Sequence, residues 1–390
     1  MTSFKVLSSG FLIAVFFLTS CNKDKNITTE TVNTEGANKT ENLTPIPSSM
    51  PQYTMPDEAK PHEGTWLQWP HQYQYGITYR TRLDATWVAM TKELVQSEKV
   101  HIIAYNATEK NRITNLLKTA AVPLAKVDFQ LLPTNDVWVR DNGPIFVKDA
   151  RGQMRIQDWG FNGWGNKTAY TKCNIIPASI GTAINMPVVN LNTAMKIEGG
   201  AYEIDGEGTF LACKSSILNS NRNPNMTQAQ AEAILSNNLG VTKFIWLDGV
   251  KGADITDMHI DGFARFANPT TIVTMNTADL QYWEVPTTDI TKLFAAKKTN
   301  GTPYKLVNLP LTKNDVVTAY GKKLGYKGSY VNFYVANTRV LLPFYNDPHD
   351  IIAKNILQGL FPTKTVVGID VRNLYENGGM IHCVTQQQPL

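Results

Sequence analysis

The chain has 390 residues, of which 43% are hydrophobic and 10% aromatic, so it can bury a core without disulfide or metal support. Its 37 basic and 33 acidic residues give a formal charge of +4, and neither sign forms a long run. This balance argues against nucleic acid or another polyanion as a partner.

The N-terminal sequence MTSFKVLSSGFLIAVFFLTSC indicates an export signal. Lys5 precedes an apolar run from Phe11 to Leu18 that is too short to span a bilayer, and Thr-Ser-Cys follows directly. The pattern resembles bacterial lipoprotein signal peptides, which are cleaved before a cysteine that becomes lipidated. We expect residues 1–20 to be removed and Cys21 to hold the protein at a bacterial membrane surface outside the cytoplasm. The alternatives are an ordinary signal peptide or a buried strand.

Residues 21–51 are rich in Asn, Thr, Glu and Lys and contain few, isolated apolar residues. Such a segment cannot bury enough surface to order itself, so a flexible tether is expected before a globular part over 52–390. If Cys21 is lipidated, Cys173, Cys213 and Cys383 remain, and an odd number leaves at least one free thiol in an oxidising compartment. The sequence leaves open whether Cys173 and Cys213 pair.

The globular part repeats one order of elements: a hairpin, a helix and a strand. A partial first copy has a helix around 83–94 and a strand at 99–106. The clearest copy has a hairpin over 202–213, a helix bounded by Thr227 and Gly240, and a buried strand over 241–247. In that helix, Thr227 and Gln230 have capping-box spacing.

Two further copies follow the same order, with hairpin, helix and strand at 259–276, 287–298 and 304–310, and then at 329–345, 350–360 and 364–370. Units that cannot bury their own faces pack around a shared core or axis. We therefore expect one closed, propeller-like α/β domain rather than two unrelated domains.

Residues whose side chains could take part in catalysis or binding follow the buried strand of successive units. They are Asp141 after 127–132, Glu198 after 186–192, His259 and Asp261 after 241–247, Asn332 after 304–310, and Cys383 after 364–370. In a closed ring these points converge on the axis, so carboxylates, a histidine, an amide and a thiol are expected in one pocket. Taken singly, these residues also have structural explanations. Asp141 could cap a turn, Glu198 could be a turn residue, and Asn332 could be a polar group at a sheet edge. His259 could be a structural histidine and Cys383 a small buried side chain.

A cysteine together with a histidine suggests nucleophilic catalysis, because a thiolate needs a proton partner. The expected pocket has more carboxylates than a cysteine and histidine pair requires, which predicts a cationic substrate. Two carboxylates can hold a guanidinium and leave its central carbon open to sulfur. His382 is not chosen as the base, because in an extended segment it would point away from the face of Cys383. No Cys/His spacing suggests a metal.

Eight blocks in order carry a resemblance: MPDEAKPHEGTWLQWP, WVRDNGPIFV, DWGFNGWGNK, EGGAYEIDGEGTFL, ILNSNRNP, TDMHIDGFARF, SYVNFYVAN and GGMIHCVTQQQP. Together they resemble the agmatine deiminase and bacterial peptidylarginine deiminase family of guanidino-group-modifying enzymes, over about 53–389. The resemblance implies the pentein fold, an α/β propeller of five ββαβ-type units around a pseudo-fivefold axis. It implies no cofactor and no metal.

The resemblance also implies roles for the converging residues. Cys383 matches the nucleophile and His259 the general acid/base, while Asp141 and Asp261 match the carboxylates that grip the guanidinium. Glu198 matches an acidic residue beside the histidine or substrate. The remaining residues are expected to line the substrate pocket: Asn332, Trp138 as a wall, and Gly379, which with Gly378 would give the backbone room to approach substrate.

Agmatine is the best single substrate expectation, converted to N-carbamoylputrescine and ammonia through an S-linked intermediate. Free or peptidyl arginine is the alternative. The segment NKTAYTKCNIIPASIG is basic and polar where agmatine enzymes carry acidic residues, and Ile255, Met258, Asn377 and Met380 depart from the family pattern. A different class of function is a surface lipoprotein that binds a guanidino ligand without turnover. The presence of both Cys383 and His259 argues against it.

Overall fold

The structure is a computed structural model that describes residues 51–390. The predicted signal peptide, the predicted lipidation site Cys21 and the predicted tether up to residue 50 lie outside the described residues. The described residues belong to one compact unit, Ile46–Leu390. Within 51–390, no helix combines the length and the apolar character that a membrane crossing requires.

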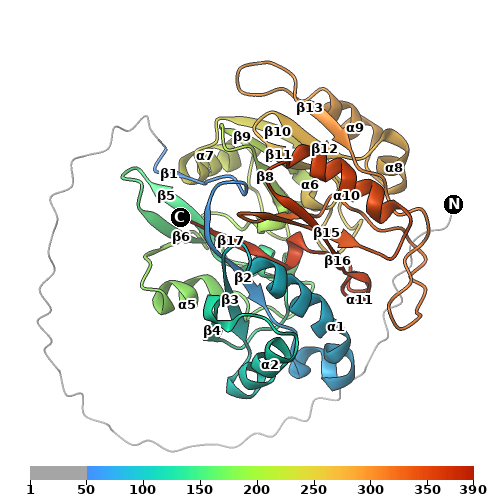
Figure 1. Cartoon of the computed structure of the whole chain (residues 1–390). Coiled ribbons are helices and arrows are strands. Elements are labelled where there is room, and N and C mark those ends of the chain that lie inside the picture. Colours follow the sequence, from blue (N-terminus) through green and yellow to red (C-terminus); the bar gives the residue numbers. More distant parts are fainter. Residues whose placement is uncertain (1–50) are drawn as a thin grey trace, which may run out of the picture. The chain divides into compact units, whose positions relative to one another are not determined.

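The described strands form five sheets that share one plan (Figure 1). An antiparallel pair is followed, after at least one helix, by a strand parallel to its neighbour. In four of the sheets, three neighbouring strands are also consecutive in the chain. The first two are β5 (Ile145–Asp149), β6 (Met154–Asp158) and β7 (Val188–Asn190), with β1 (Tyr53–Thr54) beside β5, and then β8 (Tyr202–Ile204), β9 (Thr209–Cys213) and β10 (Lys243–Leu247). The other two are β11 (Arg265–Asn268), β12 (Thr271–Thr274) and β13 (Lys305–Asn308), and then β14 (Tyr334–Val335), β15 (Arg339–Phe344) and β16 (Thr365–Asp370).

The remaining sheet joins strands from both ends of the described chain. Its order is β17 (Gln386–Pro389), β2 (His62–Gln68), β3 (Lys99–Ala104) and β4 (Val127–Leu131). β17 runs antiparallel to β2, with Gln386 opposite Trp66, and the Trp66 indole donates a hydrogen bond to Gln388 Oε1 at 2.9 Å. The C-terminal strand therefore supplies the hairpin partner that the predicted first copy lacks.

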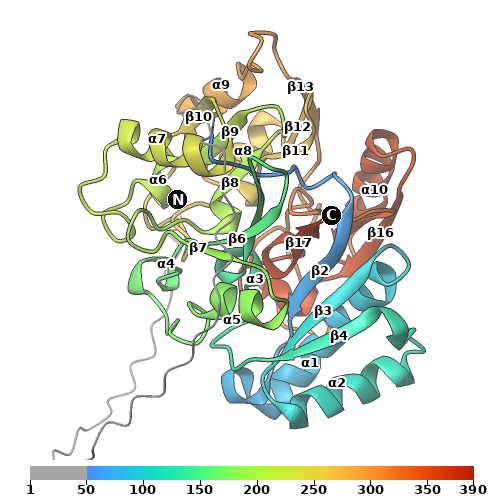
Figure 2. The same cartoon turned by 90° about the vertical axis from the view of Figure 1, so that its left-hand side faces the viewer.

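Helices connect the strands, and the longer ones lie outward of the sheets (Figures 1 and 2). The α-helices are α1 (Gln72–Leu94, broken at Gly76), α2 (Ala107–Thr119), α3 (Val139–Asn142), α4 (Gly163–Asn166), α5 (Ile176–Ala183), α6 (Lys214–Ile217), α7 (Gln228–Leu239), α8 (Thr277–Tyr282), α9 (Thr287–Phe294), α10 (His349–Leu360) and α11 (Arg372–Tyr375). Short 3-10 helices are η1 (Leu124–Lys126), η2 (Gly199–Ala201), η3 (Ile260–Gly262) and η4 (His382–Val384).

The predicted elements of the repeat are present. The hairpin predicted at 202–213 is β8 and β9, and the helix predicted from Thr227 to Gly240 is α7, with its capping box formed and Gly240 ending it at φ +75°. The two later units also have their hairpins, helices and parallel strands. In the β5–β7 unit only the last strand was predicted, within 186–192. Its hairpin and helix were not predicted; the helix, α5, is short and follows an irregular glycine-rich loop.

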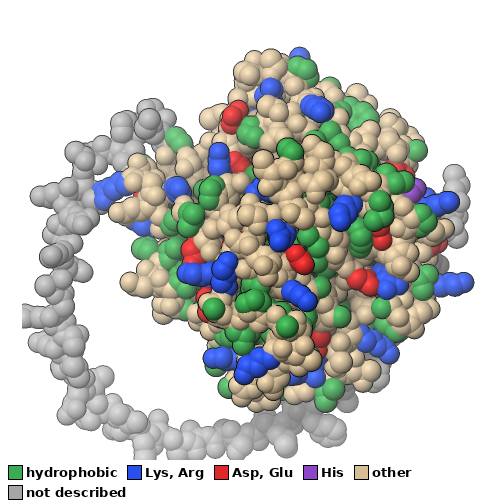
Figure 3. All heavy atoms as spheres, viewed as in Figure 1, with side chains coloured by type: hydrophobic (Ala, Val, Ile, Leu, Met, Phe, Trp, Pro, Cys, Tyr) green, Lys and Arg blue, Asp and Glu red, His purple; other side chains and the backbone are tan. Residues whose placement is uncertain are grey.

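Apolar faces of the helices pack against the sheets. In α1, Leu83, Trp87, Met90 and Leu94 recur at helical spacing and are fully buried, so one stripe of the helix covers the sheet. Cys173 and Cys213 lie buried in the same core and are free thiols, which answers the question of their pairing. On the face in Figure 3, Lys and Arg side chains are scattered rather than gathered into one patch.

Candidate active site

The predicted site residues lie on connections that follow the last strand of each unit. Asp141 is in α3 after β4, Glu198 precedes η2 after β7, His259 and Asp261 flank the start of η3 after β10, Asn332 precedes β14 after β13, and Cys383 is in η4 after β16. Helix α3 contacts both η2 and η4, and η2 contacts η3. The connections thus bring residues far apart in sequence to one place.

Gly200 marks the point where three of these side chains meet. A Cβ built on Gly200 would lie 2.8 Å from Asp141 Oδ1, 2.8 Å from His259 Nδ1 and 3.0 Å from Asp261 Oδ2. The Gly200 amide also donates a hydrogen bond to Asp141 Oδ1 at 3.1 Å. The absence of a side chain at this position therefore keeps open the space between two carboxylates and an imidazole.

His259 lies between acidic groups and is buried. Its Nε2 is 3.4 Å from Glu198 Oε2, and its Nδ1 is 3.7 Å from Asp141 Oδ1. Burial lowers the pKa of His259, but the carboxylates of Asp141, Glu198 and Asp261 outweigh it and raise that pKa to about 9. The imidazole is therefore protonated at neutral pH and can donate a proton.

The two carboxylates beside Gly200 have different surroundings. Burial raises the pKa of Asp141 to about 6, and repulsion from Asp261 and Glu198 acts in the same direction. Burial also acts to raise the pKa of Asp261, but a hydrogen bond from His382 Nδ1 at 2.8 Å and the charges around it lower that pKa. Asp261 is therefore the more firmly ionised of the pair.

An ion-pair network behind His259 fixes its loop. Arg222 Nε donates to Glu198 Oε1 at 3.0 Å, and its Nη1 pairs with Asp257. Asp257 and Met258 both have left-handed backbone conformations, with φ of +62° and +73°. Non-glycine residues adopt this conformation at an energetic cost, so the buried Arg222 contacts hold a strained segment directly before His259.

A second strained loop holds Asp141 from the other side. Trp164 has φ of +53°, and its indole Nε1 donates to Asp141 Oδ2 at 2.9 Å. With the Gly200 amide on Oδ1, both oxygens of Asp141 have a fixed donor. Sequence reasoning missed Trp164, although its block DWGFNGWGNK was part of the resemblance.

Asn332 positions the end of η4 where Cys383 lies. Its Oδ1 accepts hydrogen bonds from the amides of His382 at 2.9 Å and Cys383 at 3.4 Å, and its Nδ2 donates to the Asp261 carbonyl at 3.1 Å. Cys383 Sγ is 3.5 Å from Asn332 Oδ1 and 3.9 Å from Asp261 Oδ2. Asn332 therefore connects the thiol segment to the carboxylate segment.

The surroundings of Cys383 favour its neutral thiol. Burial, and after it the carboxylates of Asp261 and Asp141, raise the pKa of the Cys383 thiol well above its usual value. A cation placed between the carboxylates would remove much of this repulsion and favour the thiolate. The site is therefore arranged so that a cationic ligand can activate the nucleophile.

Trp138 and Gly379 pack against one another. A Cβ on Gly379 would lie 2.2 Å from the Trp138 ring, so this glycine makes room for the indole. The role of Gly379 in giving the backbone room to approach substrate stays a prediction. Among the departures from the family pattern, Met258 and Met380 are buried, Ile255 is exposed, and Asn377 donates to the Tyr79 hydroxyl at 2.7 Å.

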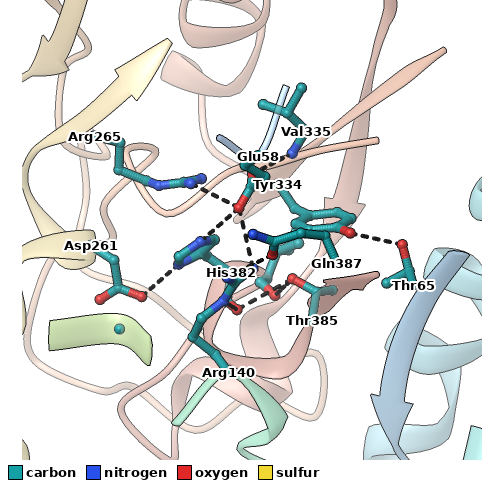
Figure 4. A network of polar contacts seen from close by, with 12 residues as sticks. Glu58, Thr65, Arg140, Asp261, Arg265, Tyr334, Val335, His382, Thr385 and Gln387 are labelled. Atoms are coloured by element: carbon teal, nitrogen blue, oxygen red, sulfur yellow. Dashed lines mark hydrogen bonds and ion pairs between the residues drawn. The ribbon is translucent and has the colours of Figure 1, made fainter. Parts of the chain in front are cut away.

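A charged network lies behind the thiol segment (Figure 4). Glu58 Oε2 accepts from Arg140 at 3.2 Å, from Arg265 at 3.0 Å and from His382 Nε2 at 2.9 Å. His382 lies in a 3-10 helix and not in the extended segment predicted for it. Its ring points to Asp261 and Glu58, so it serves the carboxylate and not the thiol.

Sequence reasoning did not assign roles to Glu58, Arg265, Arg222 or Gly200. All four fall inside quoted blocks, so their presence was visible but their partners were not. Within 51–390, no group of three or more His, Cys, Asp or Glu side chains could hold a metal ion.

The repulsion between Asp261 and Cys383 predicts the pH dependence of thiol alkylation. In Asp261→Asn, one negative charge beside the sulfur is lost, so we expect iodoacetamide to modify Cys383 at lower pH than in the unmodified chain. Peptide mass spectrometry of Cys383 over a pH series measures this. Asp128→Asn, on β4, is the matched control. An unchanged or upward-shifted alkylation profile in Asp261→Asn would contradict the assigned electrostatics.

Comparisons with known proteins identify relatives of this chain. The chain is 31% identical over 360 residues to the agmatine deiminase of Pseudomonas syringae pv. tomato, covering 86% of this chain and 95% of that protein. A structure of the Enterococcus faecalis agmatine deiminase matches with a TM-score of 0.77 at 25% identity, covering 89% of this chain and 99% of that one.

A cysteine-to-serine variant of the Campylobacter jejuni agmatine deiminase with substrate bound matches with a TM-score of 0.73 at 25% identity, covering 86% of this chain and 96% of that one. The sequence model of the Porphyromonas-type peptidyl-arginine deiminase family matches residues 54–389. The chain therefore belongs to the Porphyromonas-type peptidyl-arginine deiminase family, a conclusion that the predicted resemblance had anticipated.

Proposed function

We propose that the chain is a hydrolase that deiminates a small guanidino compound, with agmatine as the leading substrate and N-carbamoylputrescine and ammonia as products. The observation that carries this proposal is that the side chains of Asp141, His259 and Asp261 meet beside Gly200. Two carboxylates and an imidazole approach one point within about 3 Å, and Asp261 Oδ2 lies 3.9 Å from Cys383 Sγ. A planar cation held there by Asp141 and Asp261 would present its central carbon to sulfur.

The first half of the reaction uses the charges of the site. The bound guanidinium offsets the carboxylates that raise the pKa of Cys383, so the thiol can lose its proton to water and attack the central carbon. The tetrahedral adduct collapses as a carbon–nitrogen bond breaks. Protonated His259 donates to the departing nitrogen, which leaves as ammonia.

The second half returns the enzyme to its starting state. His259, now neutral, accepts a proton from a water molecule that attacks the S-linked amidine carbon. The carbon–sulfur bond breaks and the hydroxyl group of the adduct loses its proton, which gives the ureido product. The departing Cys383 thiolate takes up a proton, so the neutral thiol is restored. Glu198 and Asp141 stabilise the protonated imidazole in both halves, because both face it.

We further propose that the five sheets stand around one pseudo-fivefold axis as a closed pentein propeller. The pairing of β17 with β2 supports closure, because it joins the C-terminal strand to the N-terminal one. The convergence of five connections on one site supports a common axis.

A second candidate substrate is free or peptidyl arginine, giving citrulline. Lys167 Nζ lies 2.7 Å from Asp257 Oδ2, two residues before His259, and is partly exposed. A cation at this loop favours a substrate carboxylate over the second ammonium of agmatine. The name of the family also includes peptidyl arginine.

Turnover assays test the proposed reaction directly. The chain without residues 1–20 is incubated with agmatine, arginine and an arginine peptide, and ammonia and ureido product are measured. We expect turnover of at least one of them, with agmatine fastest, and a loss of about a thousand-fold or more in Cys383→Ala. Tight binding without product would support a guanidino-binding lipoprotein instead.

A matched pair of glycine variants tests whether substrate binds in the space between these side chains. In Gly200→Ala the new methyl group occupies the space between the carboxylates and the imidazole, so kcat/KM is expected to fall at least about a hundred-fold. Gly359→Ala, in α10, meets no atom within 4 Å and is the control. Equal activity of the two variants would show that substrate does not occupy this space.

We propose that the protein is anchored by lipid on Cys21 at a bacterial membrane, outside the cytoplasm. The run FLIAVFFLTSC supports this proposal. Mass spectrometry of the mature protein from bacterial membranes is expected to find an N-terminal Cys21 carrying acyl chains. An unmodified Cys21, or a chain that still begins at Met1, would contradict the anchor.

A further inference from the structure

His382 occupies a position between two buried carboxylates. Its Nδ1 lies 2.8 Å from Asp261 Oδ2, and its Nε2 lies 2.9 Å from Glu58 Oε2. Only 2% of its side chain is exposed. Both ring nitrogens therefore face carboxylate oxygens, which accept hydrogen bonds.

Glu58 links this histidine to two arginines. Besides His382, its Oε2 accepts from Arg140 and Arg265, and its Oε1 accepts from the Val335 amide at 2.8 Å. Burial acts to raise the pKa of Glu58, but Arg265, His382 and Arg140 together lower it well below its usual value. Glu58 is therefore a fixed anion at the centre of the network in Figure 4.

Charged groups face His382 from several elements. Three carboxylates face the network, namely Asp261, Glu58 and Glu203, the last at 4.0 Å from His382 Nε2. Arg140 and Arg265 supply two positive charges, and Arg140 Nε also donates to the His382 carbonyl at 3.3 Å. The protonated His259 also acts on Asp261 and lowers its pKa. To these charges His382 adds a direct hydrogen bond to Asp261 and another to Glu58.

We propose that His382 is a positioning residue for Asp261, and that Glu58 holds His382 in that role. His382 fixes which oxygen of Asp261 faces the space above Gly200, and its hydrogen bond to that oxygen stabilises the carboxylate. The same residue precedes Cys383 in the chain, and both amides bind Asn332. One short segment therefore places the thiol and orients the carboxylate that grips the substrate.

The effect of this arrangement on catalysis rests on the proposed deiminase function, whereas its effect on Asp261 does not. Without His382, Asp261 would keep only the charges of His259 and Arg265 against the cost of burial, so it would take up a proton more readily. A protonated Asp261 could not pair with a guanidinium. As the pH falls, a protein without His382 would then lose substrate binding at a higher pH than the wild-type protein.

The test uses two isosteric variants of the full chain. In His382→Asn the amide nitrogen takes the place of Nδ1 and can still donate to Asp261. In His382→Gln it takes the place of Nε2 and can donate only to Glu58. Both variants remove the charge. Glu58→Gln is a third variant, which keeps the shape of the glutamate and its acceptor oxygen.

The control is a second buried histidine that also lies between two carboxylates. His101, on β3, faces Glu63 at 2.7 Å and Asp128 at 2.8 Å, and it contacts no residue of the site. His101→Gln therefore reports the general cost of removing such a histidine. It is expected to leave the kinetic constants for agmatine unchanged.

The first readout does not depend on activity. Aspartate labelled with ¹³C at the carboxyl carbon is titrated by NMR, and the Asp261 signal is assigned by its loss in Asp261→Asn. We expect Asp261 to titrate about one pH unit or more higher in His382→Gln, by less in His382→Asn and Glu58→Gln, and not at all differently in His101→Gln. An unchanged midpoint in His382→Gln overturns the proposal. If that variant does not fold, an unchanged Asp261 titration midpoint in Glu58→Gln overturns the proposal.

The second readout is the pH profile of kcat/KM for agmatine. We expect the acidic limb to move to higher pH in His382→Gln, with KM raised more than kcat is lowered, and His382→Asn to recover part of the loss. A uniform fall in kcat with an unmoved profile overturns the positioning role. If the wild-type chain turns over none of the guanidino substrates, the proposed function fails, and the NMR titration still decides the role of His382.

Discussion

The structure depends on holding three carboxylates together in a buried place. Asp141, Glu198 and Asp261 all act on the same imidazole, and like charges this close repel one another strongly away from water. Each of them has its own fixed partners: the Trp164 indole and the Gly200 amide for Asp141, Arg222 for Glu198, and His382 for Asp261. The negative site exists because these partners prevent the carboxylates from all taking up protons or moving apart.

The fold supplies those partners from distant parts of the chain. Glu58 comes from the segment between β1 and β2 and reaches His382 across 324 residues of sequence. Arg265 is on β11, Arg140 is in α3, and both bind Glu58. The network behind the site therefore ties the first described segment to the last, close to the place where β17 pairs with β2. Assembly of the site and joining of the two ends are parts of the same packing.

The acid–base properties of the site follow from the same charges. His259 is protonated because carboxylates surround it, and Cys383 is neutral because they repel its thiolate. A guanidinium would change both conditions at once, since it brings the missing positive charge. Selection for a cationic substrate and activation of the thiol are thus consequences of one electrostatic arrangement.

Local patterns in the sequence predicted the elements and the main site residues. The capping box at Thr227, the stop at Gly240 and the alternation of hairpins with helices are local signals, and the structure contains them. The position of Cys383, His259 and Asp261 after equivalent strands could be inferred from the repeat.

Roles that depend on long-range contacts could not be predicted in this way. Nothing near Glu58 in the sequence shows that it meets His382, and the role of Gly200 is visible only from the three side chains around it. The orientation of His382 was predicted from an extended backbone, whereas the segment forms a 3-10 turn. The contact of Gly379 with Trp138 joins residues more than two hundred positions apart, so the local sequence could not show it.

The central claim is that a guanidinium held by these carboxylates is attacked by Cys383. Rapid acid quenching during turnover of agmatine, followed by peptide mass spectrometry, tests it most directly. The account predicts a mass increase equal to agmatine less ammonia, located on Cys383 and absent without substrate. Turnover without any adduct on Cys383, or an adduct on another residue, would contradict it.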